Sequence, residues 1–202
     1  FSIKINNEVI FMSKELEIEF KTLLTKDEYI KLCEKFKDCK RNLQINYYFD
    51  TSRFTLKASD IGLRVRMLDK DKYIVTLKRK KGYVLQEINE NINKETFDQF
   101  LSTGIVPVEE IQKDLEDVIK GQLLVNYMSL STYRIGFPYK KGQLAIDKCK
   151  YVDTVDYELE YEATSYEAGK REFVEIVREF GITYKKSQPK IKRAYDALRK
   201  KI

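Results

Sequence analysis

The chain has 202 residues, of which 43% are hydrophobic and 12% aromatic, and 38 basic against 32 acidic residues give a formal net charge of +6. This composition excludes an intrinsically disordered chain and allows one well-buried domain. No apolar run approaches the ~20 residues of a membrane-spanning helix. His is absent, and Cys33, Cys39 and Cys149 form no CxxC pair. These facts exclude His-based catalysis and structural zinc, and they favour a cytoplasmic location.

The first stretch, residues 1–11, is too short and too polar for a secretory signal peptide. Met12 followed by Ser13 and Lys14 is typical of a natural start. We therefore expect residues 1–11 to be upstream or added sequence, and residues 12–202 to form a single domain.

Eight segments rich in β-branched and aromatic residues are predicted strands, and most are bounded by turn-forming residues. They are 15–23, 43–50, 61–68, 72–80, 83–91, 130–137, 143–149 and 155–163. The connections at 69–71, 81–82 and 140–142 are short enough for hairpins, which makes neighbouring strands antiparallel. Helices are predicted over 26–38, 94–102, 107–121, 165–180 and 187–200, the first with a capping box formed by Thr25 and Glu28.

Charged residues repeat at alternate positions along these strands. The segment 15–21 places Glu15, Glu17, Glu19 and Lys21 on one face, opposite Leu16, Ile18 and Phe20. The same pattern recurs in other strands, which gives one further set of charges that share a face: Arg64, Arg66, Lys78, Lys80, Arg134, Asp147, Glu158, Glu160 and Glu162. Each strand alone could present an ordinary solvated face. Together, however, like charges lie side by side on single strands, which destabilises a sheet unless they are countered.

An α+β fold with an eight-stranded antiparallel closed β-barrel and helices packed outside accounts for this pattern. The charged faces would line the tunnel of such a barrel, which can enclose one small ligand. Arginine and lysine bind phosphate oxygens, and clustered carboxylates hold hard cations such as Mg²⁺ or Mn²⁺. Alternation and charge therefore predict a metal-bound polyphosphate as the ligand.

The motifs also follow, in order, those of a known family. EIEFK at 17–21, NYYFDT at 46–51, LRVR at 63–66, TLK at 76–78, QEIN at 86–89, IDK at 146–148, ELEYE at 158–162 and YKKSQPK at 184–190 resemble those of the CYTH, or triphosphate tunnel metalloenzyme, superfamily. The resemblance covers about residues 14–198 and is strongest to small single-domain bacterial members.

The resemblance implies a role for each matching residue. Catalytic roles fall to Glu17, Glu19, Lys21 and Lys78. The implied phosphate ligands are Lys21, Arg64, Arg66, Lys78, Arg134, Lys185 and Lys190. The implied metal ligands, for Mg²⁺ or Mn²⁺, are Glu17, Glu19, Asp147, Glu158 and Glu160, with Glu87 and Glu162 as further acidic tunnel residues. Tyr47 and Tyr48 are expected to pack rather than to take part in chemistry.

The function predicted from these observations is metal-dependent hydrolysis of a small-molecule triphosphate, with inorganic triphosphate as the leading substrate. Thiamine triphosphate, a nucleoside triphosphate and ATP cyclisation remain alternatives on the same fold. A non-enzymatic polyphosphate or nucleic-acid binder is a further alternative, because the segment 190–201 is basic. We expect Ile191, Ala194, Tyr195 and Leu198 to pack that helix against the barrel instead. We expect no membrane partner, and the sequence leaves monomer and homodimer open.

Overall fold

The computed structural model describes residues 4–5, 8–9, 18–68, 72–81 and 84–201. Glu15 and Glu17 lie outside the described residues. Two short strands, β1 (Lys4–Ile5) and β2 (Glu8–Val9), pair with each other antiparallel near the N-terminus. The candidate site is built by the rest of the chain.

Eight strands form one antiparallel sheet, which confirms the predicted strand number and pairing. Their bounds are Ile18–Leu24 (β3), Arg41–Thr51 (β4), Ile61–Leu68 (β5), Lys72–Lys81 (β6), Val84–Ile92 (β7), Leu124–Tyr139 (β8), Gly142–Tyr151 (β9) and Thr154–Ala163 (β10). The order across the sheet is β3-β10-β9-β8-β4-β5-β6-β7, so β3 and β7 are its edges.

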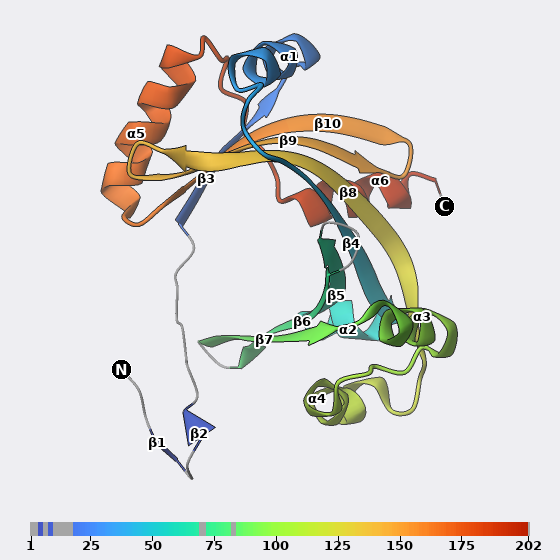
Figure 1. Cartoon of the computed structure of the whole chain (residues 1–202). Coiled ribbons are helices and arrows are strands. Elements are labelled where there is room, and N and C mark those ends of the chain that lie inside the picture. Colours follow the sequence, from blue (N-terminus) through green and yellow to red (C-terminus); the bar gives the residue numbers. More distant parts are fainter. Residues whose placement is uncertain (1–3, 6–7, 10–17, 69–71, 82–83, 202) are drawn as a thin grey trace.

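The sheet is not closed, so the prediction of a closed barrel is wrong. Among the described residues, β3 pairs with β10 alone and β7 with β6 alone. The sheet bends instead into a C shape, with β3, β8, β9 and β10 in one arm and β5, β6 and β7 in the other (Figure 1). Closure requires strand tilt and stagger to match around the whole circumference, whereas alternation fixes only the face that each side chain takes. A strongly curved open sheet satisfies the same alternation.

Strand β8 begins six residues before the predicted segment 130–137 and joins the two arms through its pairing with β4. The register between these strands shifts between Tyr48 and Phe49. There the amide of Asn126 donates hydrogen bonds to the carbonyls of Tyr48 and Met128, at 3.0 and 3.1 Å. Asn is a weak strand former, and this irregular position gives it a role that propensity alone does not reveal.

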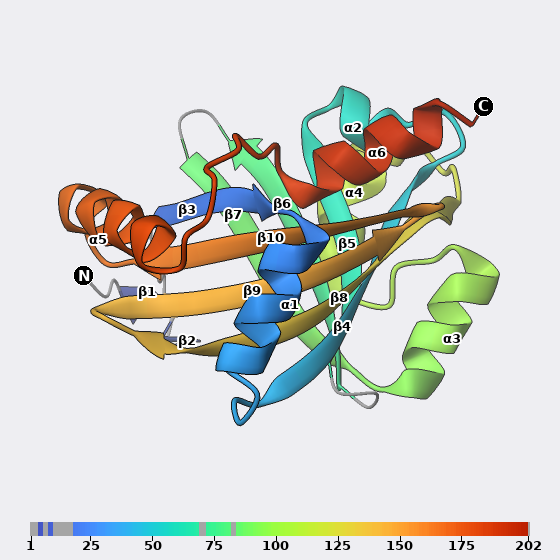
Figure 2. The ribbon, with the colours of Figure 1, turned by 90° about the horizontal axis from the view of Figure 1, so that it is seen from above.

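Two helices cover the outer face of the arm that contains β3 (Figures 1 and 2). In α1 (Lys26–Lys35) the predicted capping box is confirmed, because the Thr25 amide donates to the Glu28 carboxylate at 2.6 Å and the Glu28 amide donates to Thr25 Oγ1 at 3.2 Å. The second helix is α5 (Tyr166–Glu179). The core beneath them consists of Leu24, Leu32, Ile135, Leu144, Ile146, Leu159, Tyr161, Phe173, Ile176 and Ile182.

The other arm is covered by α3 (Lys94–Thr103) and α4 (Glu109–Ile119), together with a single turn, α2 (Thr55–Ala58), that the sequence did not predict. Asp50 explains this turn. Its carboxylate, in a residue only 2% exposed, accepts the backbone N–H groups of Thr51, Leu56 and Lys57 at 2.7–3.0 Å. A buried carboxylate needs such partners, so the role of Asp50 is structural.

The last helix, α6 (Lys190–Arg199), corrects the prediction that the helices pack outside, because it lies on the concave face (Figures 1 and 2). Ala194 is fully buried there, and Leu198 packs beside it. They meet the inward-facing residues Tyr48, Met128, Leu130, Cys149 and Tyr151. These apolar side chains need a cover on the inner face. The prediction that this helix packs is therefore confirmed for Ala194 and Leu198. None of the helices within the described ranges combines the length and apolarity needed to cross a membrane.

Candidate active site

The charged residues that alternate along the strands point to the concave face of the sheet. The register pairs Arg134 with Asp147 across β8 and β9, and Lys78 with Glu87 across β6 and β7. Residues directly opposite each other on paired strands share one face. The structure thus turns these charges inward, as the alternation predicts.

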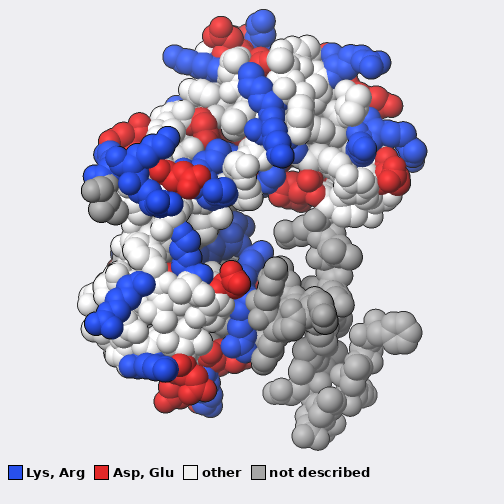
Figure 3. All heavy atoms as spheres, turned by 180° about the vertical axis from the view of Figure 1, so that it is seen from behind, with Lys and Arg blue, Asp and Glu red and all other residues white. Residues whose placement is uncertain are grey.

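The concave face encloses a cavity of about 630 Å³, within the ~300–1,000 Å³ that is typical of small-molecule sites. Figure 3 shows the hollow from behind, with Lys and Arg side chains along it. Its lining includes ten residues that the sequence placed in the site: Glu19, Lys21, Arg64, Arg66, Lys78, Glu87, Arg134, Glu160, Glu162 and Lys190.

One side of the cavity is an acidic wall on β3, β9 and β10. We define this acidic wall by its carboxylates Glu19, Asp147, Glu158, Glu160 and Glu162. Lys190 Nζ lies 2.5 Å from Glu160 and 2.7 Å from Asp147, and it also lies 3.2 Å from Glu158. Arg134 donates two hydrogen bonds to Asp147, at 2.7 and 2.8 Å, and one to Glu160 at 2.5 Å. Basic residues of the chain itself therefore neutralise much of this wall.

Two carboxyl groups of the acidic wall converge at the cavity surface. Burial, with the nearby charges of Asp147 and Glu19, raises the pKa of Glu160 to about 7, although Lys190 opposes the shift. Burial acts on Glu19 as well, but hydrogen bonds with Glu160 and Lys21 lower its pKa. Lys21 Nζ lies 2.6 Å from Glu19. Glu160 and Glu19 thus lie within hydrogen-bonding reach of each other at the cavity surface.

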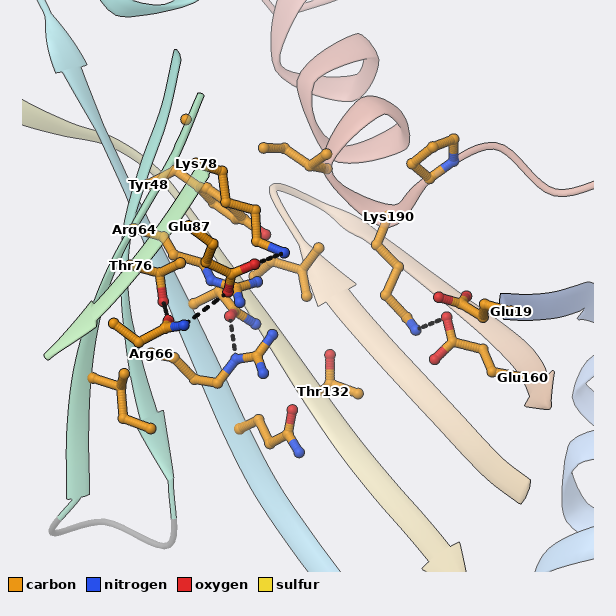
Figure 4. A pocket seen from close by; sticks show the side chains of 18 of the residues that line it. Glu19, Tyr48, Arg64, Arg66, Thr76, Lys78, Glu87, Thr132, Glu160 and Lys190 are labelled. Carbon is orange, nitrogen blue, oxygen red and sulfur yellow. Dashed lines mark hydrogen bonds and ion pairs between the residues drawn. The ribbon is translucent and has the colours of Figure 1, made fainter. Parts of the chain in front are cut away.

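The opposite side of the cavity is a basic wall on β5 and β6, which we define by Arg64, Arg66 and Lys78 (Figure 4). Lys78 Nζ lies 2.8 Å from Glu87, the carboxylate of the adjacent strand β7. Arg66 Nε donates to the side-chain oxygen of Asn46 at 2.9 Å. Three cations thus face the cavity beside one carboxylate of the same arm.

Within the described basic wall, Arg64 has a hydrogen-bond donor without a partner. Its Nε is buried and has no hydrogen-bond acceptor among the described residues. A buried donor without an acceptor costs roughly 1–3 kcal/mol. An anion in the cavity is the kind of partner that relieves this cost, because guanidinium groups bind phosphate oxygens well.

Four residues that the sequence placed in the site do not line the cavity in the described structure. Asp147 and Glu158 lie behind the lining, with fully buried side chains. Lys185 lies elsewhere, with its Nζ 3.5 Å from the carboxylate of Glu28 on α1. Glu17 lies outside the described residues. The roles predicted for these four residues stay predictions.

The structure also adds two residues, Tyr48 and Arg193, to those that the sequence placed in or beside the cavity. Tyr47 packs outward against Phe97, with ring centroids 4.9 Å apart, whereas Tyr48 points inward and lines the cavity. Tyr48 and Asn46 lie at alternate positions of β4 and therefore share a face. The spacing could have indicated that Tyr48 also points inward. Arg193 on α6 reaches Glu158, but only the folded position of the helix reveals that contact.

The donor set fits a hard divalent cation. Within the described residues, no group of three or more acidic, cysteine or histidine side chains converges as a metal site. Glu19 and Glu160 nevertheless converge as a pair at the cavity surface. Proteins often hold Mg²⁺ through one or two carboxylates, with substrate phosphates and water completing the shell. Glu19 and Glu160 thus fit a metal that binds together with a phosphate ligand.

A curved antiparallel sheet with a charged cavity on its concave face can enclose a small, charged ligand. The CYTH domain family model matches residues 15–195, and the chain belongs to this family. The family resemblance drawn from the ordered motifs is therefore confirmed.

Known proteins agree with this assignment. "Putative triphosphatase YjbK" of Bacillus subtilis (strain 168) is 32% identical over 193 residues, which cover 95% of this chain and 100% of that protein. A Bacillus halodurans structure described as a "putative adenylate cyclase" is 33% identical, with a TM-score of 0.74 over 89% of this chain and 97% of that one. HpAC1 from Hippeastrum, described as having a dominant triphosphatase activity, is 21% identical. Its TM-score is 0.70 over 92% of this chain and 96% of that one, which shows a shared fold.

Proposed function

We propose that this protein hydrolyses triphosphates in its cavity, with Mg²⁺ or Mn²⁺ as the cofactor and inorganic triphosphate as the leading substrate. One observation carries the proposal: Arg64, whose Nε has no acceptor among the described residues, and the Glu19–Glu160 carboxyl pair line opposite sides of a single cavity. The basic wall supplies phosphate ligands, and the carboxyl pair supplies hard oxygen ligands for a cation. The putative triphosphatase YjbK and HpAC1, with its dominant triphosphatase activity, support the proposed reaction class.

The residues of the two walls have separate tasks in this proposal. Arg64, Arg66 and Lys78 would bind the phosphate chain and stabilise the negative charge of a phosphoryl-transfer transition state. Lys78 would exchange its ion pair with Glu87 for a phosphate oxygen. Glu19 and Glu160 would hold the metal. When bound, a divalent metal supplies further charge neutralisation and lowers the pKa of water.

Inorganic triphosphate is favoured because the described residues that line the cavity offer no open aromatic surface for a base or a thiazole ring. Among the described residues that line it, Tyr48 is the single aromatic, and it is only 9% exposed. Base recognition usually requires an open aromatic face. A nucleoside triphosphatase or an adenylate cyclase, the class named for the Bacillus halodurans neighbour, is the second candidate.

A panel of inorganic, thiamine and nucleoside triphosphates with Mg²⁺ or Mn²⁺ tests the proposal. We expect release of phosphate fastest from inorganic triphosphate, no cyclic nucleotide, and no turnover in EDTA. Lys78→Ala should abolish turnover without unfolding the protein. Lys72→Ala, at an exposed position of the same strand, should leave turnover unchanged. Turnover that survives both EDTA and Lys78→Ala would contradict the proposal. Faster release from a nucleoside triphosphate would overturn the substrate preference alone.

A further inference from the structure

Glu158 is the most completely occupied carboxylate of the acidic wall. Its side chain is 0% exposed. Oε1 accepts hydrogen bonds from Arg193 Nη1, at 3.1 Å, and from Ser187 Oγ. Oε2 accepts from Arg193 Nη2, at 3.1 Å, and lies 3.2 Å from Lys190 Nζ. Because a carboxylate offers about four acceptor positions, groups of the chain itself occupy all those of Glu158.

Arg193 has a similarly complete set of contacts. Its side chain is 12% exposed, and Nε donates to Asp156 at 2.8 Å while Nη2 reaches the other oxygen of Asp156 at 3.4 Å. Nη1 also donates to Ser187 Oγ at 2.6 Å and to the carbonyl of Gln188. One guanidinium therefore joins two residues of β10 to the segment that leads into α6. The rigid fork of arginine suits this task, and a lysine ammonium cannot reproduce it.

The first residues of α6 depend on this connection. Pro189, Lys190 and Ile191 line the cavity, and they lie within one turn of Arg193. Lys190 in turn contacts Asp147 and Glu160. The position of Arg193 therefore fixes where the ammonium of Lys190 stands in the acidic wall.

We propose that Arg193, Glu158, Asp156 and Ser187 form a latch that holds α6 against the cavity. In this latch Arg193 is a positioning residue that acts through Lys190, and Glu158 is its anchor. The latch itself is a property of the fold. Its effect on catalysis rests on the proposed triphosphatase function.

Hydrogen–deuterium exchange on the full-length protein tests the latch without any substrate. In Arg193→Lys, which keeps the charge but loses the fork, we expect amides of residues 187–195 to exchange at least tenfold faster than in the wild type. Lys192→Gln is the matched control, because its side chain on the same helix is 56% exposed and pairs only with Asp196 in the described structure. Equal protection in wild type and Arg193→Lys would overturn the latch.

Kinetics separate positioning from a merely structural role. Loss of folded enzyme lowers kcat and leaves KM unchanged, whereas a misplaced Lys190 should raise the KM for inorganic triphosphate at least fivefold while kcat stays within twofold. We expect the second result for Arg193→Lys below its unfolding transition. A fall in kcat alone would overturn the positioning role.

A wild type that does not hydrolyse triphosphates would refute the proposed function, and hydrogen exchange would then decide the latch alone.

Discussion

The two walls of the cavity carry opposite charges and differ in how those charges are satisfied. In the acidic wall, Arg134 and Lys190 lie within 2.5–2.8 Å of the carboxylates of Asp147 and Glu160. In the basic wall, one buried donor of Arg64 has no acceptor among the described residues. The acidic wall is therefore satisfied by groups of the chain itself, whereas the basic wall retains a donor that the proposed anion could satisfy.

Energetics explain why the walls can differ in this way. Buried charges are tolerated when they are paired and hydrogen-bonded, and removing one partner leaves the other at a large cost. The acidic wall follows this rule with partners from β8 and α6. The basic wall keeps part of its binding capacity free, which is useful for a ligand but adds little to stability. Substitutions in the two walls should consequently affect different measurable quantities.

The largest effect is expected in the acidic wall. Asp147→Asn removes a fully buried negative charge that pairs with Arg134 and Lys190, and breaking such pairs costs about 3–5 kcal/mol. For a chain of this size we expect the melting temperature to fall by about 10 °C. Circular dichroism melts provide the measurement. Asp153→Asn is the control, since its side chain is 73% exposed and should change the melting temperature by less than about 2 °C. Equal melts for the two variants would contradict the contrast.

The next effect belongs to the basic wall and should appear in activity rather than stability. Arg64→Ala removes a proposed phosphate ligand, so kcat/KM for inorganic triphosphate should fall roughly 100-fold, which corresponds to about 2.7 kcal/mol. Its melting temperature should not decrease, because the buried Nε loses no acceptor in the described structure. Phosphate release and thermal melts measure the two quantities on one preparation. A large loss of stability with unchanged kcat/KM would reverse the comparison.

The smallest effect should lie outside both walls, at Glu28. Burial acts against its charged form, but hydrogen bonds from the backbone of Thr25 and Thr183 outweigh it and hold the pKa of Glu28 at about 2, below the usual 4.5. Above pH 4.5 the carboxylate is ionised in both states and its stabilisation is complete. Between pH 4.5 and 2 only the unfolded state takes up the proton, so the free energy of unfolding falls as the pH falls.

Glu28→Gln should therefore reduce the free energy of unfolding at pH 7 by about 1–2 kcal/mol and flatten its decline between pH 4.5 and 2. Urea melts across this range measure both. Lys185→Ala sharpens the comparison, because Lys185 contacts Glu28 and does not line the cavity. It should change kcat/KM less than twofold. A loss as large as that of Arg64→Ala would place Lys185 among the phosphate ligands after all.

Much of the site was predictable because it depends on local geometry. Alternate strand residues share a face, so the inward orientation of Glu19, Lys78 and Glu160 follows from their spacing. The capping box of Thr25 and Glu28 is equally local. The ordered motifs identified the family, since they run along nearly the whole chain.

Other features depend on distances between parts of the chain that no local pattern relates. Alternation cannot tell whether the edges β3 and β7 meet, and in the described structure they do not. It also cannot tell which cation neutralises which carboxylate. Glu158 and Glu160 are equivalent in sequence, yet Arg193 and Lys190 occupy the first, while the second faces the cavity beside Glu19.

The sequence by itself thus determined the strand number, the inward charges and the family, because periodicity and motif order are properties of the chain. Only the tertiary structure decided that, within the described residues, the sheet stays open, α6 lies inside it, and one wall is paired while Arg64 of the other keeps a donor without an acceptor. Those outcomes depend on where α6 and the sheet edges come to lie, and hence on packing across the whole molecule.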